Sequence, residues 1–184
     1  MPAEPFLRRA ILDDADRIAA LHAESWRRHY RGAYSDAFLD GDVFADRQGV
    51  WGRRLREPTD ESATVVAGEG ADLVGFIHIV FDEDRRWGSL VDNLHVTPSR
   101  QRCGIGSRLL AEAASLVISR GRSAIYLWVL EQNTAAQAFY RTRGGRCSER
   151  RPVPPPAGIP GRLLGSPVML RFAWSDAALL LASD

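Results

Sequence analysis

The sequence predicts one domain of the mixed α/β class, with helices flanking a mixed, mostly antiparallel sheet. The chain has 184 residues, of which 45% are hydrophobic and 26% charged, as is usual for a globular domain with a sizeable core. Segments with helical periodicity alternate with segments rich in β-branched residues, and no linker divides them. Their order is strand, two helices, three strands, helix, strand, helix and two strands, which predicts an antiparallel half followed by a strand–helix–strand crossover.

The first third of the chain is predicted to be helical after one short strand. Phe6–Ala10 is the strand candidate. Asp13-Asp14 offers caps for a helix whose apolar residues recur at helical spacing as far as Tyr30. A second helical region, Ser35–Glu57, is interrupted near residues 40–42, where aspartates flank a glycine.

The remainder alternates between strand and helix patterns. Strands are predicted at 62–67, 72–81, 89–96, 124–130, 146–151 and 167–174, and helices at 104–120 and 133–143. The segment 72–81 is apolar on both faces, which is typical of a central strand. The proline- and glycine-rich stretch Pro152–Gly165 is predicted to be a surface loop.

Composition excludes several classes of function. The net charge of +1 gives no electrostatic argument for a nucleic-acid partner. Cys103 and Cys147 have no metal-ligand spacing, so neither a metal site nor a disulfide framework is predicted. No apolar run approaches the roughly 20 residues that span a bilayer, and the N-terminus does not resemble a signal peptide. These features predict a cytoplasmic protein without a membrane partner.

The most informative segment runs from Asn93 to Ser107. A predicted strand enters a turn, and Gly104 and Gly106 then open an amphipathic helix. Unpaired backbone N–H groups and the positive end of the helix dipole converge there, which suits a phosphate or pyrophosphate. A side chain at either glycine would keep the phosphates away from the backbone.

Two nucleotide-binding alternatives fit this segment poorly. A dinucleotide fingerprint requires a third glycine where the chain has Leu109, and an acidic residue about 20 positions later, where the chain has Ala124–Val129. A phosphate-binding P-loop requires a lysine, and the sequence contains none. On this pattern alone, a plain tight turn between strand and helix, without a bound ligand, is an alternative interpretation.

The pattern Gln101-x-x-Gly104-x-Gly106 resembles motif A of the GNAT superfamily of acyl-coenzyme-A-dependent N-acetyltransferases. Leu94–Pro98 is similar to the family's fourth strand and the turn after it. Leu127–Asn133, Phe139-Tyr140 and Gly144-Gly145 resemble motif B. The resemblance covers nearly the whole chain, with both motifs in the family's order and spacing.

The resemblance implies a single N-acetyltransferase domain over 1–184 that uses acetyl-coenzyme A as acyl donor. Its fourth and fifth strands would splay apart, and the pantetheine arm would lie in the gap. The acceptor-side helices would cover about 13–57, the cofactor-binding core about 62–151, and the C-terminal strand about 167–174.

The resemblance also implies which residues contact the cofactor. Backbone groups of Leu94 and Val96 would bind the pantetheine arm, and the amides of Arg102 to Ser107 would hold the pyrophosphate. Asn133 would reach the arm, although a plain helix N-cap is an equally ordinary role for it. The full predicted set is Leu94, His95, Val96, Gln101, Arg102, Cys103, Gly104, Ile105, Gly106, Ser107 and Asn133.

Acyl transfer to an amine needs a neutral amine, a donor for the oxyanion, and a proton for the departing thiolate. Tyr140 stands where the family often places a tyrosine as the acid; its alternative role is ring packing. A backbone amide at His95 or Val96 would donate a hydrogen bond to the oxyanion. Asp92 is the candidate base, and strand alternation places it on the face of Leu94 and Val96 unless a bulge intervenes. A side-chain base is not required if the amine arrives neutral.

The acceptor is not identified by the sequence. A small-molecule amine is the first hypothesis; a protein or peptide amine, and a non-catalytic acyl-coenzyme-A-binding module, are the alternatives. A homodimer stays open, as does the acyl chain preference. Candidate walls and charges of the acceptor site, each with an ordinary structural alternative, are Trp26, Tyr30, Tyr34, Trp87, Asp36, Asp40 and Glu24.

Overall fold

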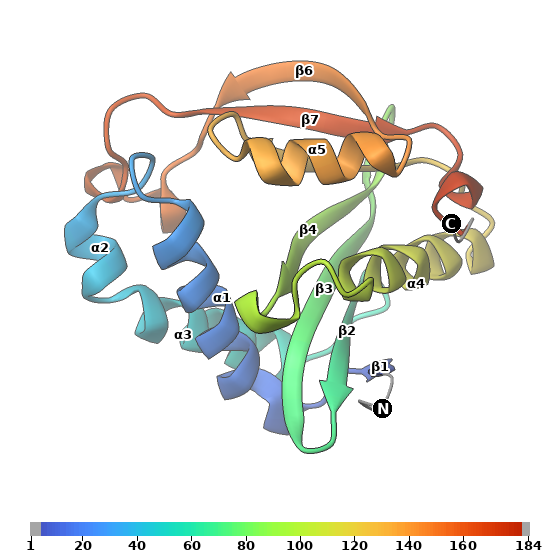
Figure 1. Ribbon diagram of the computed structural model, residues 1–184, viewed down its shortest axis with the longest axis horizontal. Coiled ribbons are helices and arrows are strands. Elements are labelled where there is room, and N and C mark those ends of the chain that lie inside the picture. Colours follow the sequence, from blue (N-terminus) through green and yellow to red (C-terminus); the bar gives the residue numbers. More distant parts are fainter. Residues whose placement is uncertain (1–4, 182–184) are drawn as a thin grey trace.

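The computed structural model describes residues 5–181, which form one seven-stranded sheet with helices on both faces (Figure 1). The strands are β1 (Phe6–Arg9), β2 (Ser62–Glu69), β3 (Asp72–Asp84), β4 (Gly88–Val96), β5 (Ile125–Leu130), β6 (Arg146–Pro152) and β7 (Val168–Trp174). The α-helices are α1 (Ala15–His29), α2 (Asp36–Asp40), α3 (Val43–Arg56), α4 (Ile105–Ser119) and α5 (Thr134–Thr142). Short 3-10 turns lie at Leu12–Asp14, Pro98–Arg100, Pro156–Gly158, Pro160–Arg162 and Ala177–Leu180.

The strand order is β1-β2-β3-β4-β5-β7-β6. All neighbours pair antiparallel except β4 and β5, which are parallel and joined through α4. A parallel neighbour needs such a crossover because the chain must return to the same end of the sheet. The predicted fold class and the predicted order of elements are therefore confirmed.

Apolar side chains divide between the two faces of the sheet. The face that we call the α4 face carries α4, and its core includes Val91, Leu127 and Phe172. The opposite α1 face carries α1 and α3, whose side chains pack on Phe76 of β3. In Figure 1, α4 and α5 lie in front of the strands, with α5 over β7.

The α1 face of β5 and β7 is covered differently. Residues of α1 and α2 pack there on Leu130 and Met169 in a separate apolar cluster. The loop after β6 closes this end, because Leu163 forms a β-bridge with Tyr34 and the Leu164 N–H donates to the Ala33 carbonyl at 2.9 Å. The predicted surface loop is thus tied to the turn that follows α1.

The helix cap expected from Asp13-Asp14 is not made by a side-chain hydrogen bond to α1. Asp14 stands at the N-cap of α1, but its side chain makes no capping hydrogen bond. Its carboxylate instead accepts two hydrogen bonds from Arg8, at 2.6 and 2.8 Å, and one from the Ile11 N–H. The hydrogen bonds from Arg8 are the main cause that lowers the pKa of Asp14. The ion pair therefore links β1 to the start of α1.

Strands β4 and β5 separate part-way along their length. They pair only from Ser89 to Val91 on β4 and from Ile125 to Leu127 on β5. At the same level the β3–β4 register shifts: Ile79 faces Val91, whereas His78 faces Asn93. Asp92 is therefore an extra residue, a β-bulge that bends β4. The splayed pair of strands predicted from the family resemblance is confirmed.

None of the helices within residues 5–181 has the length and apolar character needed to cross a membrane.

Candidate active site

The turn before α4 presents a row of free backbone amides. Arg102 has φ +61° and Gly104 has φ +78°, so the backbone passes twice through the left-handed region. The Arg108 N–H donates to the Gly104 carbonyl, whereas the amides of Arg102 to Ser107 have no partner within residues 5–181. Unpaired amides at a helix N-terminus bind anions, and phosphate is the commonest biological example.

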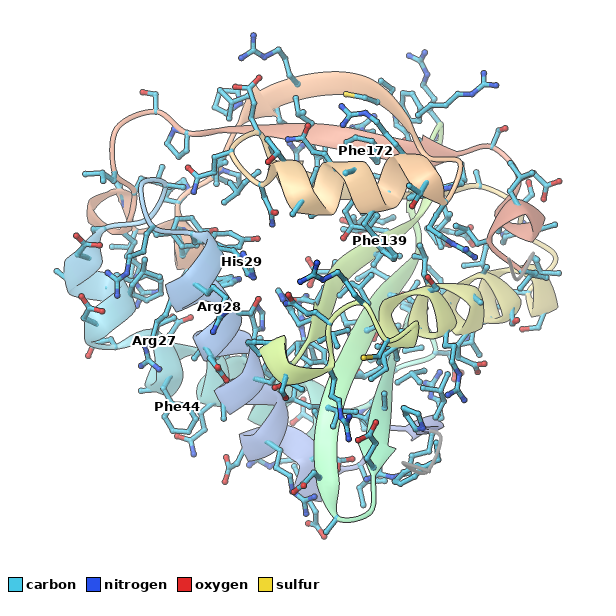
Figure 2. The ribbon with its side chains drawn as sticks, in the orientation of Figure 1. Arg27, Arg28, His29, Phe44, Phe139 and Phe172 are labelled. Atoms are coloured by element: carbon cyan, nitrogen blue, oxygen red, sulfur yellow. The ribbon has the colours of Figure 1, made fainter. Side chains whose placement is uncertain are left out.

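The two glycines of this turn have different surroundings. A Cβ atom placed on Gly104 would meet no atom within 4 Å, so it would project into open space beside the free amides. A Cβ on Gly106 would lie 3.5 Å from Phe139 and 3.9 Å from Val96. Gly106 therefore lies where the start of α4, the end of β4 and α5 meet, and Figure 2 shows Phe139 between the two helices.

Alternate backbone groups of β4 point into the gap between β4 and β5. The Thr97 N–H donates to the Val74 carbonyl of β3 at 2.9 Å. In an antiparallel pair such bonds alternate, so His95 pairs with Phe76, whereas Leu94 and Val96 turn their N–H and C=O groups away from β3. Of the two amides considered for the oxyanion, the geometry leaves that of Val96 facing the gap.

The other residues of the predicted cofactor set lie around this gap. The Gln101 amide nitrogen donates to the Val96 carbonyl at 3.4 Å, and the Cys103 thiol, which is exposed, donates to the Gln101 carbonyl. Asn133 caps α5, since its side-chain oxygen accepts from the Ala136 N–H at 3.1 Å. The structural alternative for Asn133 is thus observed, and its side-chain NH₂ group has no hydrogen-bond partner among the described residues.

Tyr140 lies on the α4 face, 8% exposed, with its ring against Phe139, Phe172 and Trp174. Its hydroxyl makes no hydrogen bond with any residue from 5 to 181. Burial raises the pKa of Tyr140 far above its usual range, and Tyr30 adds to the shift. The phenol therefore keeps its proton at physiological pH and has a donor without a partner.

Asp92 turns to the α1 face because of the bulge. Its Oδ2 accepts hydrogen bonds from Arg54 of α3 at 2.8 Å and from Asn93 at 2.6 Å. Leu94 and Val96 pack on the opposite, α4 face. The simple alternation that put all three residues on one face is wrong, and the inserted residue is the reason. The Asp92 Oδ1 has no partner among the described residues, and the side chain is 33% exposed.

A buried chain of polar groups lies beside Asp92, and sequence reasoning missed most of it. His95 Nδ1 is 2.7 Å from Ser25 Oγ, and the His95 ring lies 4.7 Å from that of His22. Trp51 Nε1 donates to His22 Nδ1 at 3.0 Å, while His22 Nε2 is buried and has no hydrogen-bond partner within the described residues. Burial lowers the pKa of His95 to about 3 and that of His22 well below its usual value. Both rings are therefore neutral.

The predicted acceptor-side residues separate into two groups. Trp26, Tyr30 and Tyr34 stack on one another with centroid distances from 4.8 to 5.3 Å, next to the end of β5. Trp87 lies elsewhere on the α1 face, against Arg171. Asp36 and Asp40 are less suited to bind a cationic amine, because both already form ion pairs with Arg31.

The sequence matches the family model described as "Acetyltransferase (GNAT) family" over residues 19–144. The chain belongs to the GNAT family of acetyltransferases. The matched range runs from α1 to the end of α5, so it contains the free amides before α4, the gap between β4 and β5, and Tyr140.

Two proteins that are similar to this chain in sequence are named as acetyltransferases. The chain is 27% identical to an uncharacterized N-acetyltransferase, YuaI, of Bacillus subtilis over 137 residues, which are 73% of this chain and 76% of the relative. It is 32% identical over 144 residues to the mycothiol acetyltransferase of Clavibacter sepedonicus, a match that covers 77% of this chain but 42% of that longer protein.

In structure, the chain is similar to the PaiA N-acetyltransferase of Thermoplasma acidophilum, which was solved in complex with coenzyme A. The TM-score is 0.72 at 19% identity, over 92% of this chain and 98% of that chain. This likeness supports the GNAT fold. The family match and the relatives in sequence identify the chain as an acetyl-coenzyme-A-dependent N-acetyltransferase.

We expect Gly104→Ala to weaken binding of acetyl-coenzyme A at least about tenfold, or about 1.4 kcal/mol, because the added Cβ occupies the open space beside the free amides. Isothermal titration calorimetry measures this change. Gly121→Ala is the matched control: Gly121 follows the other end of α4, has φ +72° and is equally open. Both variants bear the same backbone strain, so an equal loss of affinity in the two would contradict the assignment.

Proposed function

We propose that this enzyme transfers the acetyl group of acetyl-coenzyme A to the primary amine of a small molecule, by direct attack within a complex that holds both substrates. The observation that carries this proposal is the separation of β4 from β5 at Asp92. One side of the opening leads to the free amides before α4, and the other leads to the Asp92 carboxylate. The two substrates can therefore approach one another from opposite faces of the sheet.

The donor would be held almost entirely by backbone groups. The amides of Arg102 to Ser107 would bind the pyrophosphate, and the gap-facing groups of Leu94 and Val96 would pair with the pantetheine arm as a further strand does. Asn133 follows the end of β5 and caps α5, and its side-chain NH₂ would bind the pantetheine arm. Acetyl-coenzyme A supplies the activated acetyl thioester, and the remaining chemistry belongs to the residues of the chain.

Three groups are placed to handle charge and protons. The Val96 N–H faces the gap and would donate to the carbonyl oxygen as negative charge develops there. The Asp92 Oδ1 has no partner in residues 5–181 and would accept an N–H from the acceptor amine. The Tyr140 hydroxyl would donate to the departing sulfur. Since the pKa of buried Tyr140 lies above the roughly 8.5 of an ordinary thiol, the phenol would stabilise the departing thiolate by a hydrogen bond and keep its own proton. The thiolate would then take its proton from solvent.

The small size of the acceptor is supported by the closed end of the α1 face. The loop after β6 hydrogen-bonds to the turn after α1 on both sides of Tyr34: Ser35 N–H donates to the Arg162 carbonyl, and Leu164 N–H to the Ala33 carbonyl, each at 2.9 Å. Asp46 of α3 also forms an ion pair with Arg162 at 2.5 Å. An extended peptide would have to displace these contacts, whereas a small amine would not.

The direct test is release of free thiol from acetyl-coenzyme A when the purified protein meets a library of small primary amines and, separately, short peptides. We expect turnover with a subset of the small amines, and mass spectrometry of the acceptor should show one added acetyl group. Turnover confined to peptides would contradict the small-molecule proposal. Tight cofactor binding without turnover of any amine would favour a non-catalytic binding module.

Tyr140→Phe and Asp92→Asn should have different kinetic signatures. Tyr140→Phe keeps the packed ring and removes the O–H, so we expect kcat to fall by roughly 10² with little change in acetyl-coenzyme A affinity. Asp92→Asn removes the charge that attracts and deprotonates the amine, so kcat/KM should fall for the acceptor. That loss should shrink as pH rises, because more amine then arrives neutral, whereas the loss in Tyr140→Phe should stay constant.

The matched control for the aspartate is Asp82→Asn. Asp82 also forms a partly exposed ion pair, with Arg122 at 2.9 Å, on the strand next to β4, and its replacement should leave kcat/KM unchanged. An unaltered kcat in Tyr140→Phe would reduce that residue to a packing role. An Asp92→Asn loss that does not vary with pH would mean that Asp92 shapes the bulge rather than handling the proton.

A further inference from the structure

The register of the strands places four side chains in a row across the α1 face. Asp92 on β4 and Trp128 on β5 directly follow the last paired residues, Val91 and Leu127. Trp128 faces Arg171 on β7, and Arg171 faces Glu149 on β6. The row begins at the point where the strands part, which is where the proposed function places the reaction.

Arg171 is the unusual member of this row. The residue is only 6% exposed, and its guanidinium lies 4.5 Å from the Trp128 ring, 4.6 Å from Trp87 and 5.1 Å from Tyr126. Its one ion pair among the described residues joins Nη1 to Glu149 at 3.0 Å. Arg171 Nε is buried without a hydrogen-bond partner among residues 5–181. A guanidinium has five N–H donors, and leaving buried donors unpaired is costly. Asp84 interacts electrostatically with Arg171 but forms no ion pair with it among the described residues, so donors of the guanidinium stay available for an anion.

Arg54 shows the same feature on the other side of the opening. Its Nη2 donates to Asp92, while its Nη1 is buried and has no partner in the part of the chain that the structure describes. Two more guanidinium groups lie on the same face: that of Arg151 packs on Trp128, and that of Arg47, which pairs with Asp46, packs on Trp26. An acceptor with a negative group would be attracted, since arginine binds carboxylate and phosphate in pairs of hydrogen bonds.

The half-exposed Glu149 contacts only part of the Arg171 guanidinium. Its side chain is 45% exposed, and it meets Arg171 through a single nitrogen. The Trp128 ring packs on the guanidinium, so a ligand anion would reach past the edge of that ring to meet the donors that Glu149 leaves unused. Asp92, the neighbour of Trp128 across the opening, leaves its Oδ1 for the amine of the same ligand.

We propose that the acceptor is a small amine that also carries an anionic group, a carboxylate or a phosphate, and that Arg171 binds this group while the amine meets Asp92. The proposal rests on the proposed function, because it names the class of acceptor for the same site. It makes Arg171 a determinant of specificity: the side chain selects the substrate and takes no part in the proton transfers.

Matched pairs of amines test this assignment. Amino acids are compared with their carboxamides, and phosphoethanolamine with ethanolamine, so that each pair differs in the anion and the two pair types distinguish carboxylate from phosphate. For the wild-type enzyme we expect kcat/KM at least about tenfold higher for the anionic member of at least one pair, a difference of about 1.4 kcal/mol. Arg171→Met keeps an apolar stem between the rings and should abolish that preference while leaving the uncharged amines nearly unaffected.

The control variant is Arg150→Met, which removes the same charge from β6. Arg150 is exposed and pairs with Glu131 at 3.0 Å, so the preference for anionic amines should survive. Thermal shift in saturating coenzyme A gives a second readout that does not depend on turnover: anionic amines should raise the melting temperature of the wild type and not that of Arg171→Met.

The outcomes separate this inference from the proposed function. Turnover of uncharged amines at least as fast as of their anionic partners, or an equal loss for both in Arg171→Met, would overturn the inference and leave the acetyltransferase function intact. Thermal shifts by anionic amines without thiol release would support the anion site and contradict the catalytic function. Neither thermal shift nor thiol release with any amine would overturn both.

Discussion

Strands β4 and β5 share backbone pairing for only the first part of their length, and the bulge at Asp92 marks the level at which they part. The separation has two consequences that the rest of the site depends on. Backbone groups of Leu94 and Val96, which would be consumed in a continuous sheet, are left without a strand partner. The inserted residue also turns the Asp92 side chain to the face opposite Leu94 and Val96. A donor bound in the gap and an acceptor on the α1 face can therefore meet at one level of the sheet.

The opening is held by the packing on both halves of the sheet. On the α4 face, Leu109 and Leu110 of α4 are fully buried, and Tyr140, Phe172 and Trp174 form a packed aromatic group beneath α5. On the α1 face, the Arg54–Asp92 ion pair connects α3 to the bulge. Because close-packed interiors deform little, the gap keeps its shape before any ligand arrives. Preformed geometry of this kind reduces the entropic cost of binding and lets fixed dipoles act on the reacting carbonyl.

Local features of this site could be predicted from the sequence, whereas features that depend on pairing between distant segments could not. Gly104, Gly106 and the helix after them form one continuous segment, so the anion-binding turn is readable in the chain itself. The bulge at Asp92 depends on how β4 meets β3, and alternation along a single strand gave the wrong face. Arg54 lies 38 residues before its partner Asp92. Arg171 is near Trp128 only because β7 pairs with β5. A histidine on the apolar face of α1, His22, was the one signal that could have revealed the buried polar chain.

The central claim is that the donor lies in the gap and pairs with the free backbone groups of β4. Residue-resolved amide hydrogen exchange by NMR, with and without saturating acetyl-coenzyme A, tests it most directly. The account predicts that the amides of Leu94 and Val96 exchange quickly in the free enzyme and become protected when the donor binds. The His95 amide, which already pairs with β3, should be protected in both states. Leu94 and Val96 amides that exchange at the same rate with and without the donor would contradict the account.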